Sequence, residues 1–243
     1  MSISVVTINL NKRAGLRRTL ASLRGQTDRA FESIVVDGGS TDGSQDEIAR
    51  FDDVVTSATS ERDSGIYEAW NRGIARATGR VIALLNSGDA YHPDVIATLA
   101  ARVTADRDAA RKVFSGHTVT VENGRLLKSY GNRLRSNLWF GIGIVHPAMF
   151  VGREVYDAVG QYAPISIASD TDFVLRCVRR GVEFAPLEAL VYMEAGGVSV
   201  QHAVKAFRQY TESLARHGFC GTATATALGH AYGAYKGMRR AFR

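Results

Sequence analysis

Carboxylate side chains recur where apolar runs of this chain end. Asp37 follows the run Ile34-Val35-Val36, and Asp89 follows Leu84 and Leu85 after a short polar turn. Asp63 and Asp170 stand in two further acidic stretches, Glu61-Arg62-Asp63-Ser64-Gly65 and Ala168-Ser169-Asp170-Thr171-Asp172. Open α/β sheets bind ligands just beyond the carboxyl ends of their strands. Acids gathered along one such edge can hold a base, a divalent metal and a proton acceptor in a single cleft.

Apolar periodicity predicts alternating strands and helices in the first half of the chain. Leu16, Leu20 and Leu23 recur at helical spacing, whereas the β-branched run at 3–8 indicates a buried strand. This β-α-β-α rhythm implies a mostly parallel sheet with right-handed crossovers. The predicted strands are 3–8, 31–36, 54–58 and 80–85, and the predicted helices are 66–77 and 92–103.

The pattern is looser in the second half. Glu122-Asn123-Gly124-Arg125 is typical of a hairpin turn after a strand. The apolar residues after Asp170 fall on one face of a helix. The predicted strands are 113–121, 145–151 and 189–193, and the predicted helices are 170–180 and 200–217.

Bulk composition is that of an ordinary globular protein. The 243 residues are 45% hydrophobic and 22% charged, enough for a substantial core. No apolar run approaches the roughly 18 residues that span a bilayer, and the first residues lack the basic region and cleavage site of a signal peptide. Two cysteines, Cys177 and Cys220, suit a reducing compartment. We therefore expect a cytoplasmic protein.

The chain is basic, with a net charge of +6 and a pI near 9.5. The excess falls at 12–24, 125–135 and 236–243. No helix-turn-helix, zinc-finger or aromatic RNA-binding motif accompanies it, so nucleic acid is not an expected partner. The tail at 232–243 mixes aromatic and basic residues, which favours peripheral binding to the anionic inner face of the plasma membrane. Gly233 and Gly237 weaken a helix there, so a disordered soluble tail is the alternative.

Five blocks in this order resemble a known family. The chain is similar to family 2 glycosyltransferases of the GT-A fold, which build bacterial surface polysaccharides and glycolipids. The resemblance implies a Rossmann-like α/β fold: a mostly parallel sheet flanked by helices, a smaller acceptor-side part and a C-terminal helical tail. The matching blocks are Val5–Asn9, Val35–Gly43, Glu61–Gly73, Asn86–Asp89 and Ser169–Arg176.

By this resemblance, Asp37 accepts a hydrogen bond from the ring N–H of uracil or a similar base. Thr7 and Asn9, at the end of the neighbouring strand, would complete the base and ribose contacts. The alternative is that Asp37 caps a helix starting near Thr41 or Asp42. The Gly-rich turn 38–43 matches neither a P-loop nor the dinucleotide fingerprint. The other residues expected to border the nucleotide are Asp63, Gly65, Arg72 and Asn86, although Arg72 could equally be a solvated helix residue.

The turn Asn86-Ser87-Gly88-Asp89 stands where the family carries its metal-binding acids. The resemblance makes Asp89 a ligand of Mn²⁺ or Mg²⁺, which would neutralise the nucleotide diphosphate leaving group. The family usually has two adjacent carboxylates, and here Gly88 replaces one of them. The alternative is that Asp89 caps the following helix.

Asp170 is the predicted catalytic base, since inverting sugar transfer needs the acceptor hydroxyl deprotonated as it attacks. Ser169 stands where the family usually has another acid. Asp172, two residues on, should point elsewhere on a helix. Helix capping by Ser169 or Asp170 is the alternative. His146 could line the acceptor pocket or be a structural hydrogen-bonding residue.

These expectations describe an inverting glycosyltransferase, most simply one that uses a UDP-sugar and a glycan or lipid-linked acceptor. We interpret 1–105 as its nucleotide-sugar-binding half, 106–218 as the acceptor-binding and catalytic-base half of the same domain, and 219–243 as a basic tail. Two alternatives stay open: a nucleotidyltransferase, and a non-catalytic nucleotide-sugar or glycan-binding module. The first normally has a basic Gly-rich loop after its first strand, where this chain has Asn9-Leu10-Asn11-Lys12.

Overall fold

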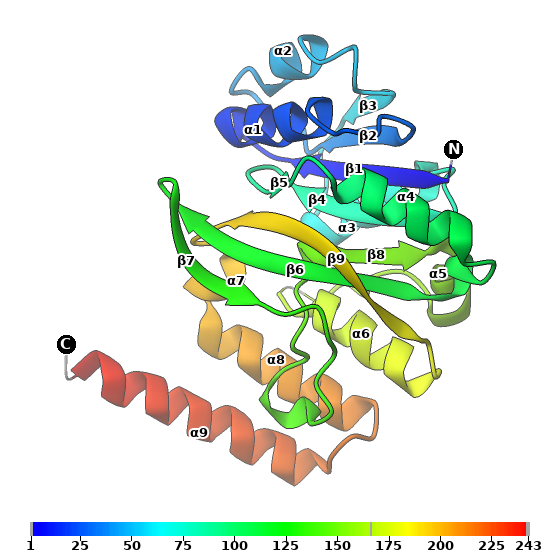
Figure 1. Ribbon diagram of the computed structural model, residues 1–243. Helices are drawn as coiled ribbons and strands as arrows, with labels where there is room; N and C mark the ends of the chain where they lie inside the picture. The colour runs from blue at the N-terminus through cyan, green and yellow to red at the C-terminus, as the bar shows by residue number, and fades with distance from the viewer. Residues whose placement is uncertain (1, 166, 242–243) are drawn as a thin grey trace.

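A computed structural model describes residues 2–165 and 167–241 (Figure 1). Within these residues one sheet of nine strands runs in the order β3-β2-β1-β4-β8-β6-β9-β5, with β7 paired to β6. The strands are β1 (Ile3–Asn9), β2 (Glu32–Asp37), β3 (Ser57–Ser60), β4 (Val81–Asn86), β5 (Ala90–Tyr91), β6 (Val113–Glu122), β7 (Arg125–Tyr130), β8 (Met149–Gly152) and β9 (Phe184–Glu194). The helices are α1 (Arg13–Arg24), α2 (Ser44–Ala49), α3 (Ile66–Arg76), α4 (Val95–Ala105), α5 (Arg153–Val159), α6 (Ser169–Arg179), α7 (Val198–Gln201), α8 (Ala203–Arg216) and α9 (Thr222–Ala241).

The sheet is parallel in its N-terminal half, as predicted. Strands β3, β2, β1 and β4 pair in parallel. Beyond β4 the pairing is mixed, because β8 is antiparallel to both β4 and β6 while β6 and β9 are parallel. The predicted α/β fold is confirmed, and the second half of the chain extends the first half's sheet.

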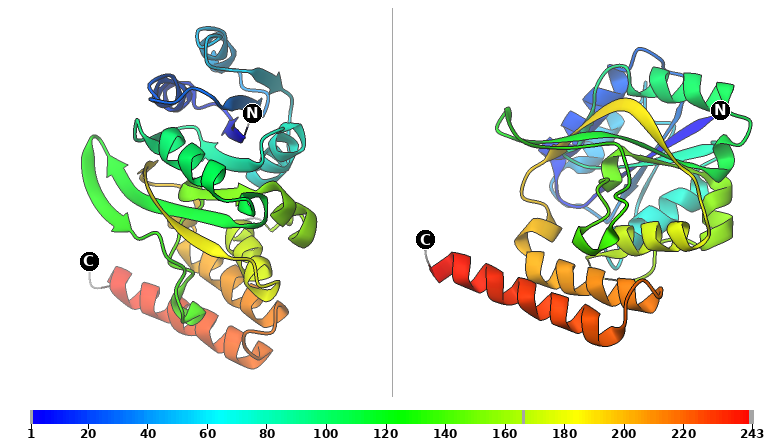
Figure 2. Two further views of the ribbon diagram at one scale, coloured as in Figure 1. Left: turned by 45° about the vertical axis from the view of Figure 1, so that its right-hand side comes forward. Right: turned by 60° about the horizontal axis from the view of Figure 1, so that its bottom comes forward.

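Helices cover both faces of this sheet (Figures 1 and 2). Apolar side chains of α1 and α4 pack on one face, where Leu16, Leu20 and Leu99 are fully buried. Helices α3, α5 and α6 pack on the other face, where Trp70 and Phe173 are the largest buried side chains. Helix α8 lies against α6, and α9 forms an outer layer on α8. The helices on the two faces leave uncovered the edge of the sheet where the parallel strands have their carboxyl ends.

Several predicted boundaries differ from those observed. The strand at 54–58 is found at Ser57–Ser60. The helix at 92–103 begins instead at Val95, and the strand at 145–151 begins at Met149 because His146–Ala148 form a 3₁₀ turn. The helix at 200–217 is interrupted at His202. Strand β9 is longer than predicted, from Phe184 to Glu194. Pro186 disguises its start, since proline is disfavoured inside strands except near irregularities of pairing, and the register with β6 shifts beside it.

The C-terminal segment is helical through Ala241, as the family resemblance implies. Two of its glycines face α8: added Cβ atoms at Gly229 and Gly233 would lie at ordinary contact distances, 3.4 Å from Thr211 Oγ1 and 3.6 Å from Val204 Cγ1. Tyr232 stacks on Phe207 with ring centroids 4.3 Å apart. Among the described residues, no helix is both long and apolar enough to cross a membrane. The basic side chains at 239–243 lie outside the described side chains.

Candidate active site

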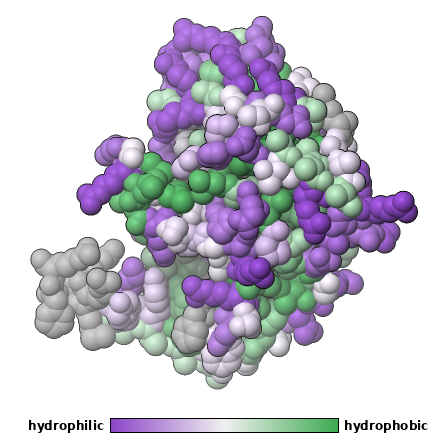
Figure 3. All heavy atoms as spheres, in the orientation of Figure 1, coloured by the Kyte–Doolittle hydropathy of each residue, from purple (hydrophilic) through white to green (hydrophobic). Residues whose placement is uncertain are grey.

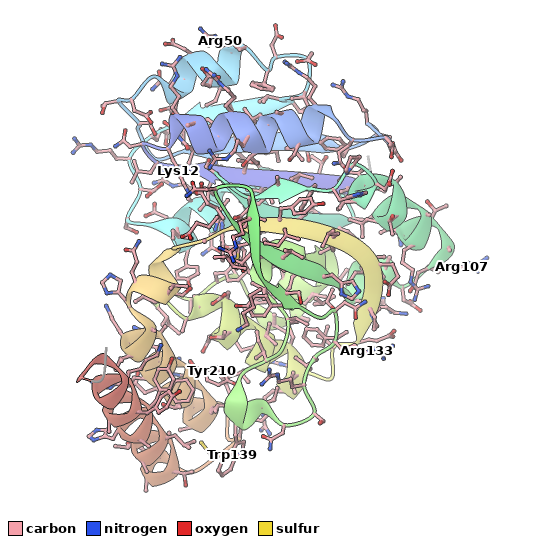
Figure 4. All side chains as sticks on the ribbon, turned by 60° about the vertical axis from the view of Figure 1, so that its left-hand side comes forward. Lys12, Arg50, Arg107, Arg133, Trp139 and Tyr210 are labelled. Carbon is pink, nitrogen blue, oxygen red and sulfur yellow. The ribbon has the colours of Figure 1, made fainter. Side chains whose placement is uncertain are left out.

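Polar side chains meet at the carboxyl ends of β1, β2 and β4. The strand register sets Asn9 opposite Asp37 and Ile8 opposite Asn86. Figure 4 brings this edge forward and shows Lys12 just beyond β1. The structure therefore gathers the ends of three predicted blocks at one edge of the sheet.

Asp37 organises the turn after β2. Its carboxylate is fully buried and accepts hydrogen bonds from Asn9 Nδ2 (2.8 Å), from the N–H (2.8 Å) and Oγ (2.5 Å) of Ser40, and from Ser60 Oγ (2.6 Å). Burial alone would raise the pKa of Asp37, but these hydrogen bonds outweigh it and lower the pKa. Helix capping by Asp37 is wrong, because α2 begins only at Ser44. A base would reach the carboxylate only if a serine hydroxyl turned away, so the uracil contact stays a prediction.

The loop with Asp63 and Gly65 lies against this turn. Asp63 Oδ1 accepts the N–H of Gly65 at 2.9 Å, and Asp63 Oδ2 is 2.8 Å from where a Cβ on Gly38 would stand. A larger residue at 38 would displace the Asp63 carboxylate from this position. Gly65, at φ +133°, favours glycine because it turns the chain into α3 in a conformation that other residues rarely adopt.

Thr7 and Arg72 are placed differently from the other predicted nucleotide contacts. Thr7 is fully buried within the sheet, and its hydroxyl has no hydrogen-bond partner in the described structure. Arg72 pairs with Glu68 one turn earlier on α3 and donates to the carbonyl of Arg62 at 3.1 Å. Arg72 therefore ties the preceding loop to α3, and its contact with a diphosphate stays a prediction.

The turn 86–89 between β4 and β5, here called the acidic turn, is held in place by α1. The Oγ1 of Thr19 donates to the carbonyl of Asp89 at 2.7 Å and accepts the N–H of Gly88 at 3.0 Å. Asp89 is 5% exposed, and its Oδ1 accepts the backbone N–H of Glu194 at 2.9 Å. Burial is the main reason that its pKa rises to about 7. Asp89 is no helix cap, because the next helix begins at Val95 after Asp94.

Three charged residues that the sequence analysis did not assign to the site stand beside this turn. Glu194, the last residue of β9, forms ion pairs with Lys12 and Arg18. A Cβ on Gly88 would lie 2.5 Å from Glu194 Oε2 and 2.8 Å from Lys12 Nζ. A carboxylate at the end of a strand was the signal that identified Asp37, and the same signal applies to Glu194. Glu194 was missed because the predicted strand stopped at 193.

Helix α3 connects the acidic turn to the acceptor side. Trp70 Nε1 donates to Asn86 Oδ1 at 3.0 Å, which fixes the first residue of the turn. The indole also packs on His146 and Tyr162, with ring centroids 4.6 and 4.9 Å away. Tyr67, one turn earlier, donates to the carbonyl of Ile167 at 2.5 Å. The sequence analysis missed this aromatic wall, although Tyr67 and Trp70 lie in a block that matches the family.

Asp170 lies at the other end of this wall, in the first turn of α6. It is half-buried, and its Oδ1 accepts the N–H of Thr171 at 2.8 Å. Burial raises its pKa to about 6. Burial raises the pKa of the Tyr67 phenol, and the nearby charge of Asp170 raises it further. Helix α6 starts at Ser169 and Ala168 is its N-cap, so neither Ser169 nor Asp170 occupies the capping position, although Asp170 accepts one N–H of the first turn.

Asp172 points away from the cleft, as predicted. It is 2% exposed and accepts hydrogen bonds from Arg176 Nε (3.1 Å), Arg216 Nη1 (3.0 Å) and His217 Nε2 (2.9 Å). Burial opposes ionisation, but His217 and Arg176 outweigh it and lower the pKa of Asp172. This carboxylate joins α6 to α8 and is not available as a base.

His146 is a neutral residue of the wall. Burial lowers its pKa to about 3, so the ring carries no charge near neutral pH. Its Nε2 is buried and has no hydrogen-bond partner among the described residues. One free ring nitrogen beside Trp70 is compatible with the predicted acceptor contact, which stays a prediction.

The fold is that of the GT-A class. Residues 1–349 of S. aureus TarS in complex with UDP-GlcNAc superpose with a TM-score of 0.68 at 16% identity, over 88% of this chain and 67% of that one. The mannosyltransferase PcManGT from Pyrobaculum calidifontis, in complex with GDP-Man and Mn²⁺, superposes with a TM-score of 0.64 at 16% identity, over 95% of this chain and 68% of that one. At these identities the likeness establishes the fold, and the predicted GT-A fold is confirmed.

The chain belongs to glycosyl transferase family 2, whose family model matches residues 4–160. A PGL/p-HBAD biosynthesis glycosyltransferase of Mycobacterium tuberculosis H37Rv is 30% identical over 208 residues, which are 81% of this chain and 78% of that relative. The family resemblance inferred from the sequence is thus confirmed. The protein is a glycosyltransferase.

Proposed function

We propose that the protein is an inverting glycosyltransferase. It transfers a sugar from a nucleotide diphosphate, most simply UDP, to a glycan or lipid-linked acceptor in surface polysaccharide or glycolipid biosynthesis. The name of the M. tuberculosis relative supports the pathway class, and the nucleotide sugars bound by the two solved structures support the donor class. In this proposal the protein acts on the cytoplasmic side of the cell, where nucleotide sugars are the donors.

One observation carries this proposal: a single helix bridges the acidic turn and Asp170. Trp70 of α3 bonds to Asn86 in the turn, and Tyr67, one helical turn away, lies beside Asp170. A leaving group at Asp89 and a base at Asp170 would therefore flank the same aromatic wall. Inverting transfer requires this arrangement, since base and leaving group act on opposite faces of the anomeric carbon.

The proposed step is a single displacement. Asp170 takes the proton of the acceptor hydroxyl while that oxygen bonds to the anomeric carbon, and the bond from that carbon to the diphosphate oxygen breaks with its electron pair. Burial makes Asp170 a stronger base than an exposed aspartate and leaves it mostly ionised at pH 7, since its pKa is about 6. The neutral ring of His146 and the indole of Trp70 would line the acceptor's approach.

The acidic turn fits a divalent cation that shares the donor's phosphates. The described residues contain no cluster of three or more His, Cys, Asp or Glu that could hold an ion alone. The carboxylate of Asp89, however, is a hard oxygen ligand of the kind Mg²⁺ and Mn²⁺ take along with phosphate oxygens and water. When bound, the ion would neutralise charge on the diphosphate. The Mn²⁺ of the archaeal mannosyltransferase structure supports this choice.

An apolar surface beside the turn supports a lipid-linked acceptor. A cavity of about 670 Å³ opens between the acidic turn and the β6–β7 hairpin, and Gly88, Leu126 and Met193 are among its lining residues. Leu126 and Leu127 are exposed on β7, where Figure 3 shows an apolar patch over the hairpin. An acceptor with an apolar carrier could lie along this hairpin.

UDP is expected to stabilise the protein more than GDP. At about 100 times its dissociation constant a ligand adds roughly 2.7 kcal/mol, which for a chain of this size raises the melting temperature by roughly 5–10 °C. Asp37→Asn should remove most of this rise, because it weakens the cluster that shapes the base site. Asp42→Asn, in the same turn but bonded to Ser44 and Arg13, is the control. Thermal denaturation measures all three; equal shifts from GDP and UDP would contradict the uracil assignment.

We further propose peripheral membrane binding through the end of α9. Each Lys or Arg near an anionic surface adds roughly 1 kcal/mol, and Arg239, Arg240 and Arg243 stand together at this end. Truncation after Lys236 removes them and keeps Tyr232 stacked on Phe207. Co-sedimentation with phosphatidylserine vesicles should fall with this truncation and with added salt. A full-length protein that stays in the supernatant at low salt would contradict this proposal.

A further inference from the structure

The space beside Gly88 is filled from another part of the chain. Glu194 is fixed there by its own backbone, because its N–H bonds to Asp89 Oδ1 at 2.9 Å. Its carboxylate extends to within 2.5 Å of where a Cβ on Gly88 would stand. The acidic turn and the end of β9 therefore bring the carboxylates of Asp89 and Glu194 to one region.

The backbone of the turn disfavours a second side chain at Gly88. Gly88 has φ +108°, a conformation that L side chains rarely adopt, and a Cβ there would displace the ends of the Glu194 and Lys12 side chains. A residue outside the turn can supply a second carboxylate without this strain. Glu194 is that carboxylate, and its side chain is 32% exposed toward the cavity that Gly88 also lines.

A positively charged side chain, that of Lys12, already lies in this region. The ammonium of Lys12 pairs with Glu194 and lies 2.8 Å from the Cβ position of Gly88. Arg18 holds the other carboxylate oxygen of Glu194. The side chains of Lys12 and Arg18 are about half exposed, so both are free to swing onto an incoming diphosphate. The ammonium of Lys12 is thus held by the Glu194 carboxylate beside Gly88, the position where the family usually has its second acid.

We propose that Glu194 is the second carboxylate ligand of the divalent cation, together with Asp89, and that Lys12 fills the cation's place until nucleotide and metal arrive. This inference rests on the proposed function. Two carboxylates, two phosphate oxygens and water complete the shell that Mn²⁺ or Mg²⁺ prefers. Lys12, once displaced, would pair with the diphosphate instead of Glu194.

Calorimetric titration of Mn²⁺ into the full chain at saturating UDP tests this. Loss of even an indirect partner of a metal ligand typically weakens metal binding about 10–100-fold, so Glu194→Gln should weaken Mn²⁺ at least about tenfold. Glu122→Gln, which changes another carboxylate that lines the same cavity, should leave the affinity unchanged. Ion pairs at the surface contribute little to stability, so Glu194→Gln should fold normally, which circular dichroism would verify.

Lys12→Met separates the roles of the two charges. With the competing ammonium gone, Mn²⁺ should bind several-fold more tightly in the absence of UDP. Unchanged or weaker binding would overturn the place-holding role of Lys12. Wild-type Mn²⁺ affinity in Glu194→Gln would overturn the assignment of Glu194. UDP binding that ignores Mn²⁺ and disappears in Lys12→Met would overturn both, because Lys12 would then be the diphosphate's counter-ion.

Failure of the proposed function would look different. A protein that binds no UDP, with or without Mn²⁺, lacks a nucleotide site, and the proposed donor is then wrong. A protein that binds UDP normally but shows equal Mn²⁺ affinity in wild type and Glu194→Gln keeps the proposed function and loses only the role of Glu194.

Discussion

Asp170→Asn is expected to bind UDP like the wild type and to transfer sugar about 10²–10⁴-fold more slowly, the usual cost of losing a general base. The amide keeps the size and shape of the carboxylate and cannot take the acceptor's proton. Single-turnover transfer measures the loss, and thermal shift with UDP verifies that donor binding survives. Transfer within about threefold of wild type would show that the base lies elsewhere.

The pH profile of the wild type should report the same group. Because burial raises the pKa of Asp170 to about 6, kcat/KM should fall about tenfold for each pH unit below 6. The stability effect has the opposite direction. A carboxyl whose folded pKa lies above its unfolded value stabilises the fold below the unfolded value and loses this contribution as pH rises through the folded pKa. Asp170→Asn should therefore be more stable than the wild type at pH 8, with the difference shrinking from pH 6 downward.

The first half of the fold was predictable because its signals are local. Continuous apolar runs marked β1, β2 and β4, and the parallel pairing that follows from them sets Asn9 beside Asp37 and Ile8 beside Asn86. Chain direction alone dictates that these ends share an edge. The predictions that Asp172 points away from the cleft and that the β6–β7 hairpin turns at 122–125 also depended only on local period.

The rest of the site depends on contacts between distant residues, which no local period encodes. Glu194 meets Asp89 only because β5 pairs with β9, and the predicted strand stopped one residue before Glu194. Trp70 had the pattern of a core residue and is one, yet its indole N–H also fixes Asn86. Asp37 was correctly placed at the strand end, but no local pattern indicated that two serines would occupy its carboxylate.

Asp172→Asn should produce the opposite result to Asp170→Asn: a large loss of stability with transfer retained in the folded protein. Removing one partner of a buried ion pair typically costs about 3–5 kcal/mol, because the other charge is left uncompensated. Arg176 keeps its bonds to the carbonyls of Gly160 and Gln161, and the Arg216 side chain is 51% exposed and can turn to water. We therefore expect the free energy of unfolding to fall by about 3 kcal/mol.

Urea unfolding at pH 7 would measure this loss, with Asp157→Asn, an exposed carboxylate on α5, as the control. The pKa of Asp172 is lowered in the fold, so its contribution is present above the unfolded value near about 3.9 and fades as pH falls through the folded value. The stability gap between wild type and Asp172→Asn should accordingly narrow below about pH 4. A variant that stays as stable as wild type but loses transfer would reverse the roles of the two aspartates and move the base to Asp172, since both lie in the first turn of α6.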